Sequence, residues 1–301
     1  MNIIITGSLG NIGKPLTRQL VQKGHTVTVI SSKDERQKDI EALGAKAAIG
    51  TMQDVTFLTK VFKTADIVYL METWEGIGSL FDQTVDFEAG MRQIGNNYKQ
   101  AIEQSGVKRV IHLSSVGAHS KKGYGTLSVH YDVEQILNQL PDDISIKFMR
   151  PVGFYTNMHR SIQTIKTQGA IISNYGGDEK EPWVSPLDIA QVIAEEMETL
   201  FEGRTVRYLA SDELSPNEMV KILGEAIGKP DLKWVVIRDE ELLEGMLAAG
   251  INAKIAKGLV DMQASQRGGL LFEDFYRNKP VLGKVKFKDF ARDFAQVYHN
   301  S

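Results

Sequence analysis

The chain opens with MNIIITGSLGNIG, residues 1–13, and this stretch decides the fold. Ile3, Ile4 and Ile5 form a continuous apolar run, which is typical of a central parallel strand covered on both faces. Three glycines spaced G-x-x-G-x-x-G follow the strand, and a helix is predicted from about residue 11 to 23. A strand, a glycine-rich turn and a helix in this order favour a dinucleotide-binding turn over a plain strand-to-helix turn.

The three glycines have different physical roles in such a turn. Gly7 lets the chain turn sharply, Gly10 lets the backbone approach a pyrophosphate, and Gly13 lets the helix pack tightly on the strand. The free N–H groups and the positive dipole end of the helix would face the phosphates. We therefore expect the whole turn to bind the cofactor, through Gly7, Ser8, Leu9, Gly10, Asn11, Ile12 and Gly13.

Composition limits the class of protein. The 301 residues, 42% of them hydrophobic, are enough for one large α/β domain with a smaller lobe. With 35 basic and 38 acidic residues the net charge is -3, so neither nucleic acid nor a membrane surface is an expected partner. The chain has no signal sequence and no stretch approaching eighteen apolar residues, so we expect a soluble, cytoplasmic protein.

The absence of cysteine excludes disulfides, thiolate metal sites and cysteine nucleophiles. The histidines also lack the spacing with acidic residues that a metal site needs, so no catalytic metal is expected; those considered are His25, His112, His119 and His159.

Apolar strands alternate with amphipathic helices up to about residue 150. This alternation predicts a Rossmann-type doubly wound parallel sheet. The expected strands are 2–6, 26–31, 46–49, 67–71, 109–114 and 145–149, and the expected helices are about 12–23, 34–43, 54–63, 83–105 and 129–140. The ligand crevice of such a sheet lies at the carboxyl ends of its strands, where we expect Gly7, Ser31, Met71 and Ser114.

The pattern is less regular after Arg150-Pro151. We expect residues 1–150 to form the dinucleotide-binding domain and residues 151–301 mainly a smaller substrate lobe, with a return of about 186–210 to the main sheet left open. Helices are expected at about 186–201, 215–228, 239–249 and 287–298, with a strand near 205–209. Ser215, Pro216 and Glu218 form a typical helix start, with Ser215 as the N-cap and Glu218 completing a capping box.

The residues after the second strand favour NADP(H) over NAD(H). An acidic side chain there would bond the free 2′-hydroxyl of NAD, whereas Ser31, Ser32 and Lys33 supply donors for a 2′-phosphate. Asp34 lies at about the distance expected for an NAD-type acid, and its alternative interpretation is an acid in the first turn of a helix. Asp54 is open to two interpretations, as an adenine contact or as a helix cap.

Four motifs occur together in the order seen in NmrA-like proteins: residues 6–13 (TGSLGNIG), 112–117 (HLSSVG), His130-x-x-x-Glu134 and 150–157 (RPVGFYTN). The chain therefore resembles this family of atypical short-chain dehydrogenase/reductase relatives over nearly all its length, more weakly after about residue 230. The resemblance implies the Rossmann fold, a bound nicotinamide dinucleotide and a substrate cleft between two lobes.

The Tyr-x-x-x-Lys pair of typical short-chain reductases is missing. If His130 takes the lysine position, Thr126 stands at the tyrosine position, and Tyr124 is followed four residues later by Ser128. This departure argues against ordinary carbonyl reduction and against sugar epimerases. NmrA-like proteins resemble either quinone and dye reductases, whose conjugated acceptors need only a weak acid, or redox sensors that bind the dinucleotide without turnover.

The expected catalytic residues are Ser114, His130 and Tyr155. His130 would contact the nicotinamide ribose or donate a proton, against the alternative of a structural histidine. Ser114, with Ser115 beside it, would lie near the nicotinamide or satisfy backbone groups at the strand end. Tyr155 or Asn157 would face the substrate, against the equal alternative that the aromatic side chains of this segment are core.

Backbone contacts complete the expected cofactor site. Met71, Glu72 and Thr73 would pass the dinucleotide through backbone groups, in a rim loop where Glu72 and Glu75 are not expected to form a catalytic pair. The motif after Pro151 would flank the nicotinamide through Val152, Gly153 and Phe154.

These features together predict an NADP(H)-dependent oxidoreductase that transfers hydride to a small conjugated electrophile such as a quinone. The alternative is a non-catalytic NADP(H)-binding sensor that acts through a protein partner.

Overall fold

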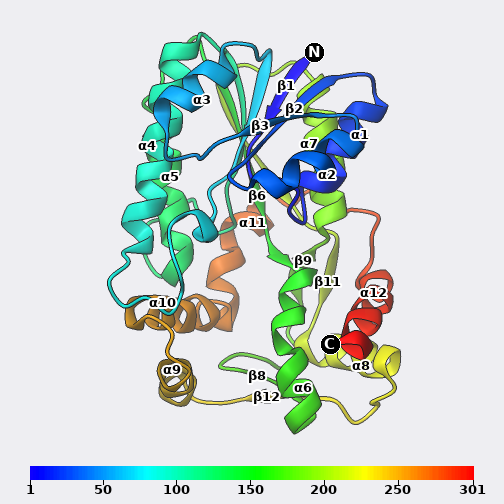
Figure 1. Cartoon of the computed structure of the whole chain (residues 1–301). Coiled ribbons are helices and arrows are strands. Elements are labelled where there is room, and N and C mark those ends of the chain that lie inside the picture. The colour runs from blue at the N-terminus through cyan, green and yellow to red at the C-terminus, as the bar shows by residue number, and fades with distance from the viewer.

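Seven parallel strands form the central sheet of the computed structural model, which describes residues 1–301 (Figure 1). The spatial order is β10-β6-β5-β4-β1-β2-β3. The strands are β1 Asn2–Ile5, β2 Thr26–Ser31, β3 Lys46–Ile49, β4 Ile67–Leu70, β5 Arg109–Leu113, β6 Ser145–Pro151 and β10 Arg204–Leu209. The parallel pairing and the flanking helices confirm the predicted Rossmann-type fold class.

Helices cover both faces of this sheet, as Figure 1 shows. One face carries α1 Gly13–Gln22, α2 Gln37–Ala42 and α7 Pro186–Glu198, and the other carries α3 Val55–Phe62, α4 Phe87–Ser105 and α5 Ser128–Leu137. Each face has its own hydrophobic cluster because alternate strand residues point to opposite sides. In β1, for example, Ile3 and Ile5 face α1 whereas Ile4 faces the α3 and α4 side.

The strand order reverses beside β1. The chain runs outward from β1 to β2 and β3, and then returns to place β4 on the other side of β1. A topological switch point of this kind opens a crevice at the carboxyl ends of the two strands that flank it. The glycine turn after β1 therefore lies beside the loop that follows β4.

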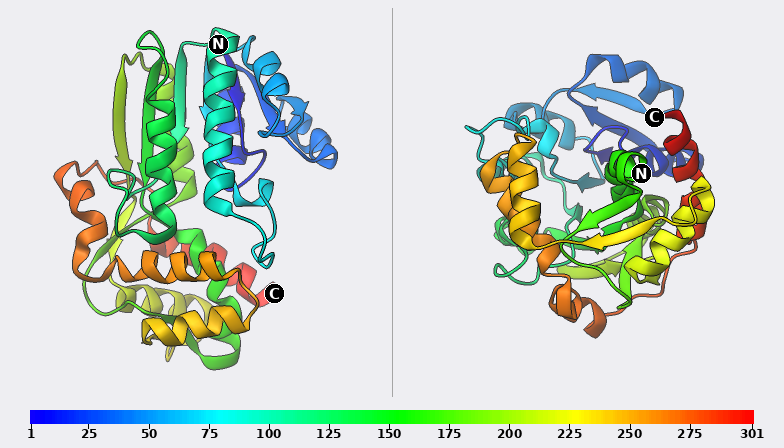
Figure 2. Two further views of the ribbon diagram at one scale, coloured as in Figure 1. Left: turned by 90° about the vertical axis from the view of Figure 1, so that its left-hand side faces the viewer. Right: turned by 90° about the horizontal axis from the view of Figure 1, so that it is seen from below.

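A second lobe lies beyond the carboxyl ends of the main strands, and Figure 2 shows its helices beneath the sheet. It contains two small sheets, with the orders β11-β9-β7 and β12-β8. Its strands are β7 Gly153–Phe154, β8 Ala170–Ser173, β9 Glu181–Val184, β11 Asp212–Leu214 and β12 Lys233–Val236. Its helices are α6 Ile162–Gln168, α8 Pro216–Ile227, α9 Asp239–Ala248, α10 Ala253–Ala264 and α12 Phe287–Asn300. Helix α11 Glu273–Arg277 instead packs through Phe275 in the hydrophobic cluster of the main sheet.

A third hydrophobic cluster joins α6, α8 and α12 in this lobe. The predicted capping box at Ser215 and Glu218 begins α8, where the Glu218 N–H donates to Ser215 Oγ at 3.1 Å and the Ser215 N–H donates to Glu218 Oε2 at 2.8 Å. Both α7 and β10 come from the later half of the chain and pack in the main domain.

Helix α4 begins later than the predicted boundary at about residue 83. Asp86 is its N-cap, because the Asp86 Oδ1 atom accepts from the Ala89 N–H at 3.0 Å. The residues before it form a loop fastened to the start of α10, where Asn252 Nδ2 donates to the carbonyls of Asp82 at 2.9 Å and Val85 at 3.3 Å.

No helix in the chain is both long and apolar enough to span a lipid bilayer.

Candidate functional site

The turn after β1 has the geometry that its glycines suggest. Gly7 has φ of 85°, a left-handed value that favours glycine, and Ser8 follows with φ of 55°. A Cβ atom on Gly13 would lie 2.1 Å from the Ser8 carbonyl oxygen, so only glycine fits there. Gly10 is different, because the nearest atom to its Cβ position is the Gly7 carbonyl at 3.6 Å. The turn is therefore tight at both ends and open in the middle.

Helix α1 begins at this turn without a cap. Its N-cap residue is Ile12, no side chain bonds its first N–H groups, and its first turn contains no acid. Helices α3 and α4 instead carry the aspartates Asp54 and Asp86 at the same position. The N–H groups of Ile12 and Gly13 have no partner, whereas that of Lys14 donates to the Gly10 carbonyl at 3.1 Å and Pro15 has none. Unpaired N–H groups and the positive dipole end of a helix together form an anion site.

The other residues of the predicted turn divide by exposure. Asn11 is exposed, Ser8 and Leu9 are half-buried, and Ile12 packs in the core. The open face of the turn therefore carries backbone and small polar groups, as a pyrophosphate would require.

The end of β2 combines one buried and two exposed side chains. Ser31 is buried, and its Oγ atom accepts from Ser8 Oγ at 3.0 Å and from the Lys33 N–H at 3.2 Å. Ser32 and Lys33 are exposed, and Lys33 has no ion-pair partner. Asp34 is also exposed, at the start of the short helix Asp34–Arg36. Ser31 therefore shapes the turn, while Ser32 and Lys33 are free to meet a ligand.

Asp54 lies at the start of α3, where its Oδ1 atom accepts from the Phe57 N–H at 3.0 Å. The structure therefore shows Asp54 as the N-cap of α3.

The loop after β4 lies against the glycine turn. The Met71 N–H donates to Thr6 Oγ1 at 2.9 Å, and a Cβ atom on Gly7 would lie 2.2 Å from the Met71 sulfur. Met71 therefore covers the first glycine at the switch point. Thr73 is half-buried and precedes the short helix Trp74–Gly76.

Glu72, in the same loop, is buried, and its side chain has a bonding partner of its own. Both of its carboxylate oxygens lie 3.1 Å from Nε2 of His112 on β5. Sequence reasoning missed this partner, because it considered His112 only as a metal ligand. The signal was the alternation of β5, which places His112 on the same face of the sheet as Val110.

Ser114 takes part in a buried charged network. Its Oγ atom donates to Glu134 Oε1 at 2.5 Å, and Glu134 also accepts two bonds from Arg150, at 2.9 Å from Nε and 2.6 Å from Nη2. Only 3% of Ser114 is exposed. Its hydroxyl hydrogen therefore joins α5 to the end of β5, and the predicted catalytic role of Ser114 stays a prediction.

His130 lies in the first turn of α5 and is half-buried. Its Nδ1 atom is enclosed and has no partner, and burial lowers the pKa of this imidazole. The charge of Glu72 opposes that effect and raises the pKa of His130. Because no protein group bonds Nε2 either, that nitrogen is free for a ligand.

The segment after β6 is held beside the end of β10, and its predicted place beside the nicotinamide stays a prediction. The Val152 N–H donates to the Leu209 carbonyl at 3.2 Å, which fixes the segment at the edge of β10. Gly153 and Phe154 are half-buried, and a Cβ on Gly153 would lie 3.0 Å from the Trp183 ring.

Tyr155 points away from the crevice, which corrects its prediction as a catalytic residue. Its side chain is fully buried in the second lobe and packs edge-on against Phe287 at 5.2 Å. Its hydroxyl donates to the Val285 carbonyl at 3.2 Å. The core alternative therefore describes Tyr155, and Asn157 two residues later is exposed.

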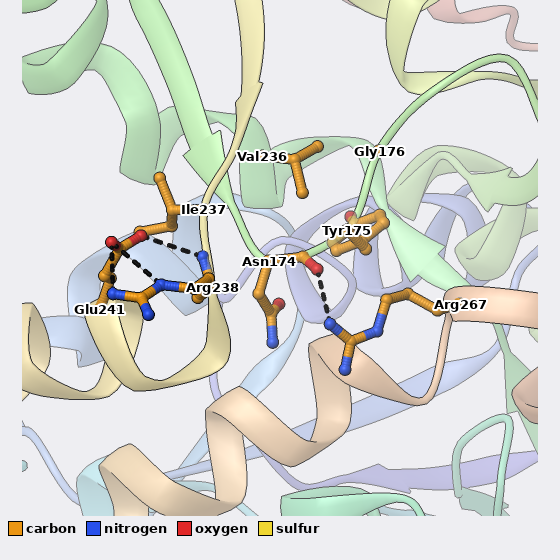
Figure 3. Close-up of a pocket in the computed structure, with 8 residues that line it drawn as sticks. All are labelled: Asn174, Tyr175, Gly176, Val236, Ile237, Arg238, Glu241 and Arg267. Atoms are coloured by element: carbon orange, nitrogen blue, oxygen red, sulfur yellow. Dashed lines mark hydrogen bonds and ion pairs between the residues drawn. The ribbon is translucent and has the colours of Figure 1, made fainter.

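A cavity of about 510 Å³ lies where β8 and β12 end together (Figure 3). Its wall combines apolar and charged groups, from Asn174, Tyr175, Gly176, Val236, Ile237, Arg238, Glu241 and Arg267. Both arginines are already paired, Arg238 with Glu241 at 2.9 Å and Arg267 with Asp239 at 2.8 Å. The cavity wall therefore combines apolar side chains with arginines whose charges are already paired.

A buried carboxyl of the second lobe predicts a pH-dependent stability. Burial, with a smaller contribution from Glu179, raises the pKa of Glu181 from its ordinary 4.5 to about 8. Between those two values the folded chain holds a proton that the unfolded chain has lost, so stability falls as pH rises through this window. We expect the E181Q variant to avoid most of this loss, on the order of 4 kcal/mol between pH 5 and pH 8.5.

Urea unfolding of the wild-type and E181Q proteins at both pH values measures this difference. Exposed Glu202 supplies the matched control, and E202Q should follow the wild-type protein. Parallel pH profiles for the wild-type protein and E181Q would contradict the assignment.

No cluster of three or more histidine, aspartate or glutamate side chains is arranged to hold a metal ion.

Comparison with known proteins gives matches in sequence and in three-dimensional structure. A sequence model described as the NmrA-like family matches residues 1–267. A photosystem II assembly factor, Ycf39 of Synechocystis sp., is 23% identical over 146 residues, which cover 48% of this chain and 43% of that relative. The chain therefore matches less than half the length of this relative.

Two solved structures share the fold over nearly the whole chain. The NADPH-dependent quinone oxidoreductase QOR2 of Escherichia coli, complexed with NADPH, superposes with a TM-score of 0.78 at 18% identity, over 97% of this chain and 99% of that one. The triphenylmethane reductase of Citrobacter sp. superposes with a TM-score of 0.74 at 18% identity, over 98% and 100%.

Proposed function

Because the chain belongs to the NmrA-like family, we propose that it is an NADP(H)-dependent oxidoreductase acting on a small conjugated electrophile such as a quinone. The observation that carries this proposal is the uncapped start of α1 behind a turn in which only glycine fits at residue 13. The solved structures of similar fold, a quinone oxidoreductase and a dye reductase, support the same reaction class.

Three parts of the crevice support the proposal that a dinucleotide binds there. The free N–H groups at the start of α1 would bind the pyrophosphate, and exposed Ser32 and Lys33 would meet a 2′-phosphate. The backbone at Val152 and Gly153 would flank the nicotinamide at the carboxyl end of β6. The bound cofactor would supply the hydride, while the protein supplies orientation and a proton.

The proton donor must differ from that of typical short-chain reductases. Thr126, at the tyrosine position, is 9% exposed, and its hydroxyl contacts the Met262 sulfur on α10. His130 is the remaining candidate acid in the crevice, with a free Nε2 atom. Hydride transfer converts a quinone into a resonance-stabilised anion, so a weak acid is enough to complete its reduction.

Binding and turnover test the proposal separately. We would titrate the purified protein with NADPH and NADH by fluorescence, add a panel of quinones, and follow the absorbance of the reduced nicotinamide. Tight NADPH binding with quinone-dependent oxidation is the expected result. Tight binding with no oxidation of NADPH by any member of the panel would favour the sensor, and absence of binding would overturn both.

Charge reversal at Lys33 tests the preference for NADP(H). We expect K33E to weaken NADPH binding by roughly 30-fold or more, because a charge-assisted bond to phosphate is replaced by repulsion. NADH, which lacks the 2′-phosphate, should lose much less affinity. Fluorescence titration with both nucleotides measures the difference, and K38E is the matched control because Lys38 is exposed on the neighbouring helix α2. Equal losses for both nucleotides would remove Lys33 from the 2′-phosphate site.

A further inference from the structure

Three fully buried polar side chains converge on two consecutive residues of the loop after β4. Thr6 Oγ1 accepts from the Met71 N–H at 2.9 Å, and the Tyr98 hydroxyl donates to the Met71 carbonyl at 2.7 Å. His112 Nε2 lies 3.1 Å from both carboxylate oxygens of Glu72. Thr6 follows β1, Tyr98 lies on α4 and His112 lies on β5, and all three are 0% exposed. We call Thr6, Glu72, Tyr98 and His112 the loop clamp.

The Glu72–His112 pair of this clamp is costly to bury. Both side chains are closed to solvent, and His112 has no other side-chain partner, because its Nδ1 atom is enclosed and unpaired. Removing ionisable groups from water is unfavourable, and apolar residues of similar volume are often as stable or more so. Packing of the core therefore does not account for this pair.

The clamped segment also carries backbone donors that no group of the protein binds. The N–H groups of Glu72 and Thr73 have no hydrogen-bond partner, whereas the Met71 N–H beside them is bonded to Thr6. Backbone N–H groups are paired almost everywhere inside folded proteins, so unpaired ones call for an explanation. Two adjacent unpaired donors on a firmly held loop are available to a ligand atom that accepts hydrogen bonds.

This segment lies at the switch point of the main sheet. Strand β4 is the neighbour of β1, and the Met71 side chain covers Gly7 of the turn that follows β1. Sheets of this type bind their ligands in the crevice at the switch point, outside the carboxyl ends of the strands. The two free donors therefore belong to the same crevice as the N–H groups at the start of α1.

We propose that the loop clamp positions the N–H groups of Glu72 and Thr73 to bind an oxygen atom of the dinucleotide. This inference rests on the proposed function, because it concerns the same cofactor. The side chains of the clamp are positioning groups, since they act on the cofactor only through the backbone of the loop. A backbone that is already fixed loses less conformational entropy when the cofactor binds, so the clamp raises affinity.

Two buried tyrosines allow the same chemical change inside and outside the clamp. Y98F removes the hydroxyl that holds the Met71 carbonyl, and we expect NADPH affinity to fall by roughly fivefold. Y69F is the matched control, because Tyr69 is also 0% exposed and its hydroxyl has no partner. It should leave NADPH affinity unchanged. Fluorescence titration measures both, and equal affinities of the folded Y98F and Y69F proteins would contradict the clamp.

Substitutions of the acid–imidazole pair separate affinity from stability. E72Q removes the charge but keeps an oxygen that accepts from His112 Nε2, so its NADPH affinity should stay within about threefold of the wild-type value. E72L/H112F removes both polar side chains, and we expect it to bind NADPH about tenfold or more weakly while resisting urea at least as well as the wild-type protein. A folded double variant that binds NADPH as tightly as the wild-type protein would overturn the proposal.

Amide hydrogen exchange, followed by NMR, reports on the loop itself. NADPH should slow exchange at Glu72 and Thr73 in the wild-type protein, because both N–H groups gain an acceptor. Before NADPH is added, the Thr73 amide of E72L/H112F should exchange faster than that of the wild-type protein, because the loop has lost a support. Unchanged exchange at both amides of the NADPH-saturated wild-type protein would show that the cofactor does not use these donors.

The same measurements separate the clamp from the proposed function. NADPH binding without oxidation by any quinone would remove the reductase, and affinity and exchange would still decide the clamp. Quinone-dependent turnover with unchanged NADPH affinity in E72L/H112F would retain the reductase and remove the clamp. A wild-type protein that binds neither NADPH nor NADH would overturn both.

Discussion

Replacing Gly13 by alanine should reduce NADPH affinity by at least about 100-fold. The added Cβ would lie 2.1 Å from the Ser8 carbonyl oxygen and 3.2 Å from its carbonyl carbon. Both atoms belong to the backbone, so the clash is relieved only by moving the turn away from α1. The N–H groups at the start of α1 would then no longer face the phosphates.

The measurement is a fluorescence titration with NADPH, accompanied by thermal unfolding. G245A is the matched control, because Gly245 lies inside α9 and a Cβ there meets no atom within 4 Å. That variant should bind NADPH normally and be slightly more stable, since alanine favours a helix by about 1 kcal/mol over glycine. Near-normal NADPH affinity in a folded G13A protein would show that the turn does not bind the pyrophosphate.

Local sequence signals were sufficient for the main sheet. Apolar runs such as Ile3–Ile5 are long enough to identify buried strands, and glycine positions identify the turn, because both depend on neighbouring residues. The start of α4 was harder, because residues 83–86 carry helix-compatible side chains but are held by Asn252, which is far away in the sequence. The short strands β8 and β12 pair across more than sixty residues, and no local pattern encodes that partnership.

In the candidate site, too, some residue environments follow from neighbouring sequence and others depend on residues far away in the chain. The exposed positions of Ser32 and Lys33 follow from the end of β2, so their type was enough to suggest a phosphate contact. The environments of Ser114 and Tyr155 depend on partners that fold back from other elements, Glu134 on α5 and Phe287 on α12. The sequence around a hydroxyl near the crevice does not reveal such distant hydrogen-bond partners.

Among substitutions that remove a charge, we expect replacement of Glu134 to destabilise the folded protein most. Glu134 accepts two bonds from Arg150 and one from Ser114, and it is 2% exposed. In E134A the guanidinium of Arg150 stays buried with only the Tyr208 hydroxyl at 3.2 Å and Asp274 at 3.6 Å. Breaking a buried ion pair in this way costs roughly 3–5 kcal/mol of unfolding free energy.

Urea unfolding measures this loss, and two further proteins show its cause. D143A removes one partner of the exposed Lys108–Asp143 pair, whose side chains are 55% and 62% exposed, and should leave the free energy of unfolding almost unchanged. The double variant E134L/R150M removes both buried charges and should be more stable than E134A, because it leaves no fully buried charge without a partner. Asp274 loses Arg150 in that variant, but its side chain is 24% exposed and its carboxylate still accepts from the Tyr208 hydroxyl.

The ordering of these proteins separates charge from packing. If the cost of E134A came only from lost volume, the double variant would be no more stable than the single one. Recovery of stability in the double variant would show that the buried ion pair makes the protein less stable than apolar residues at the same positions would. Because α5 also carries His130, NADPH-dependent activity of that folded double variant would then reveal whether the pair serves to place His130 in the crevice.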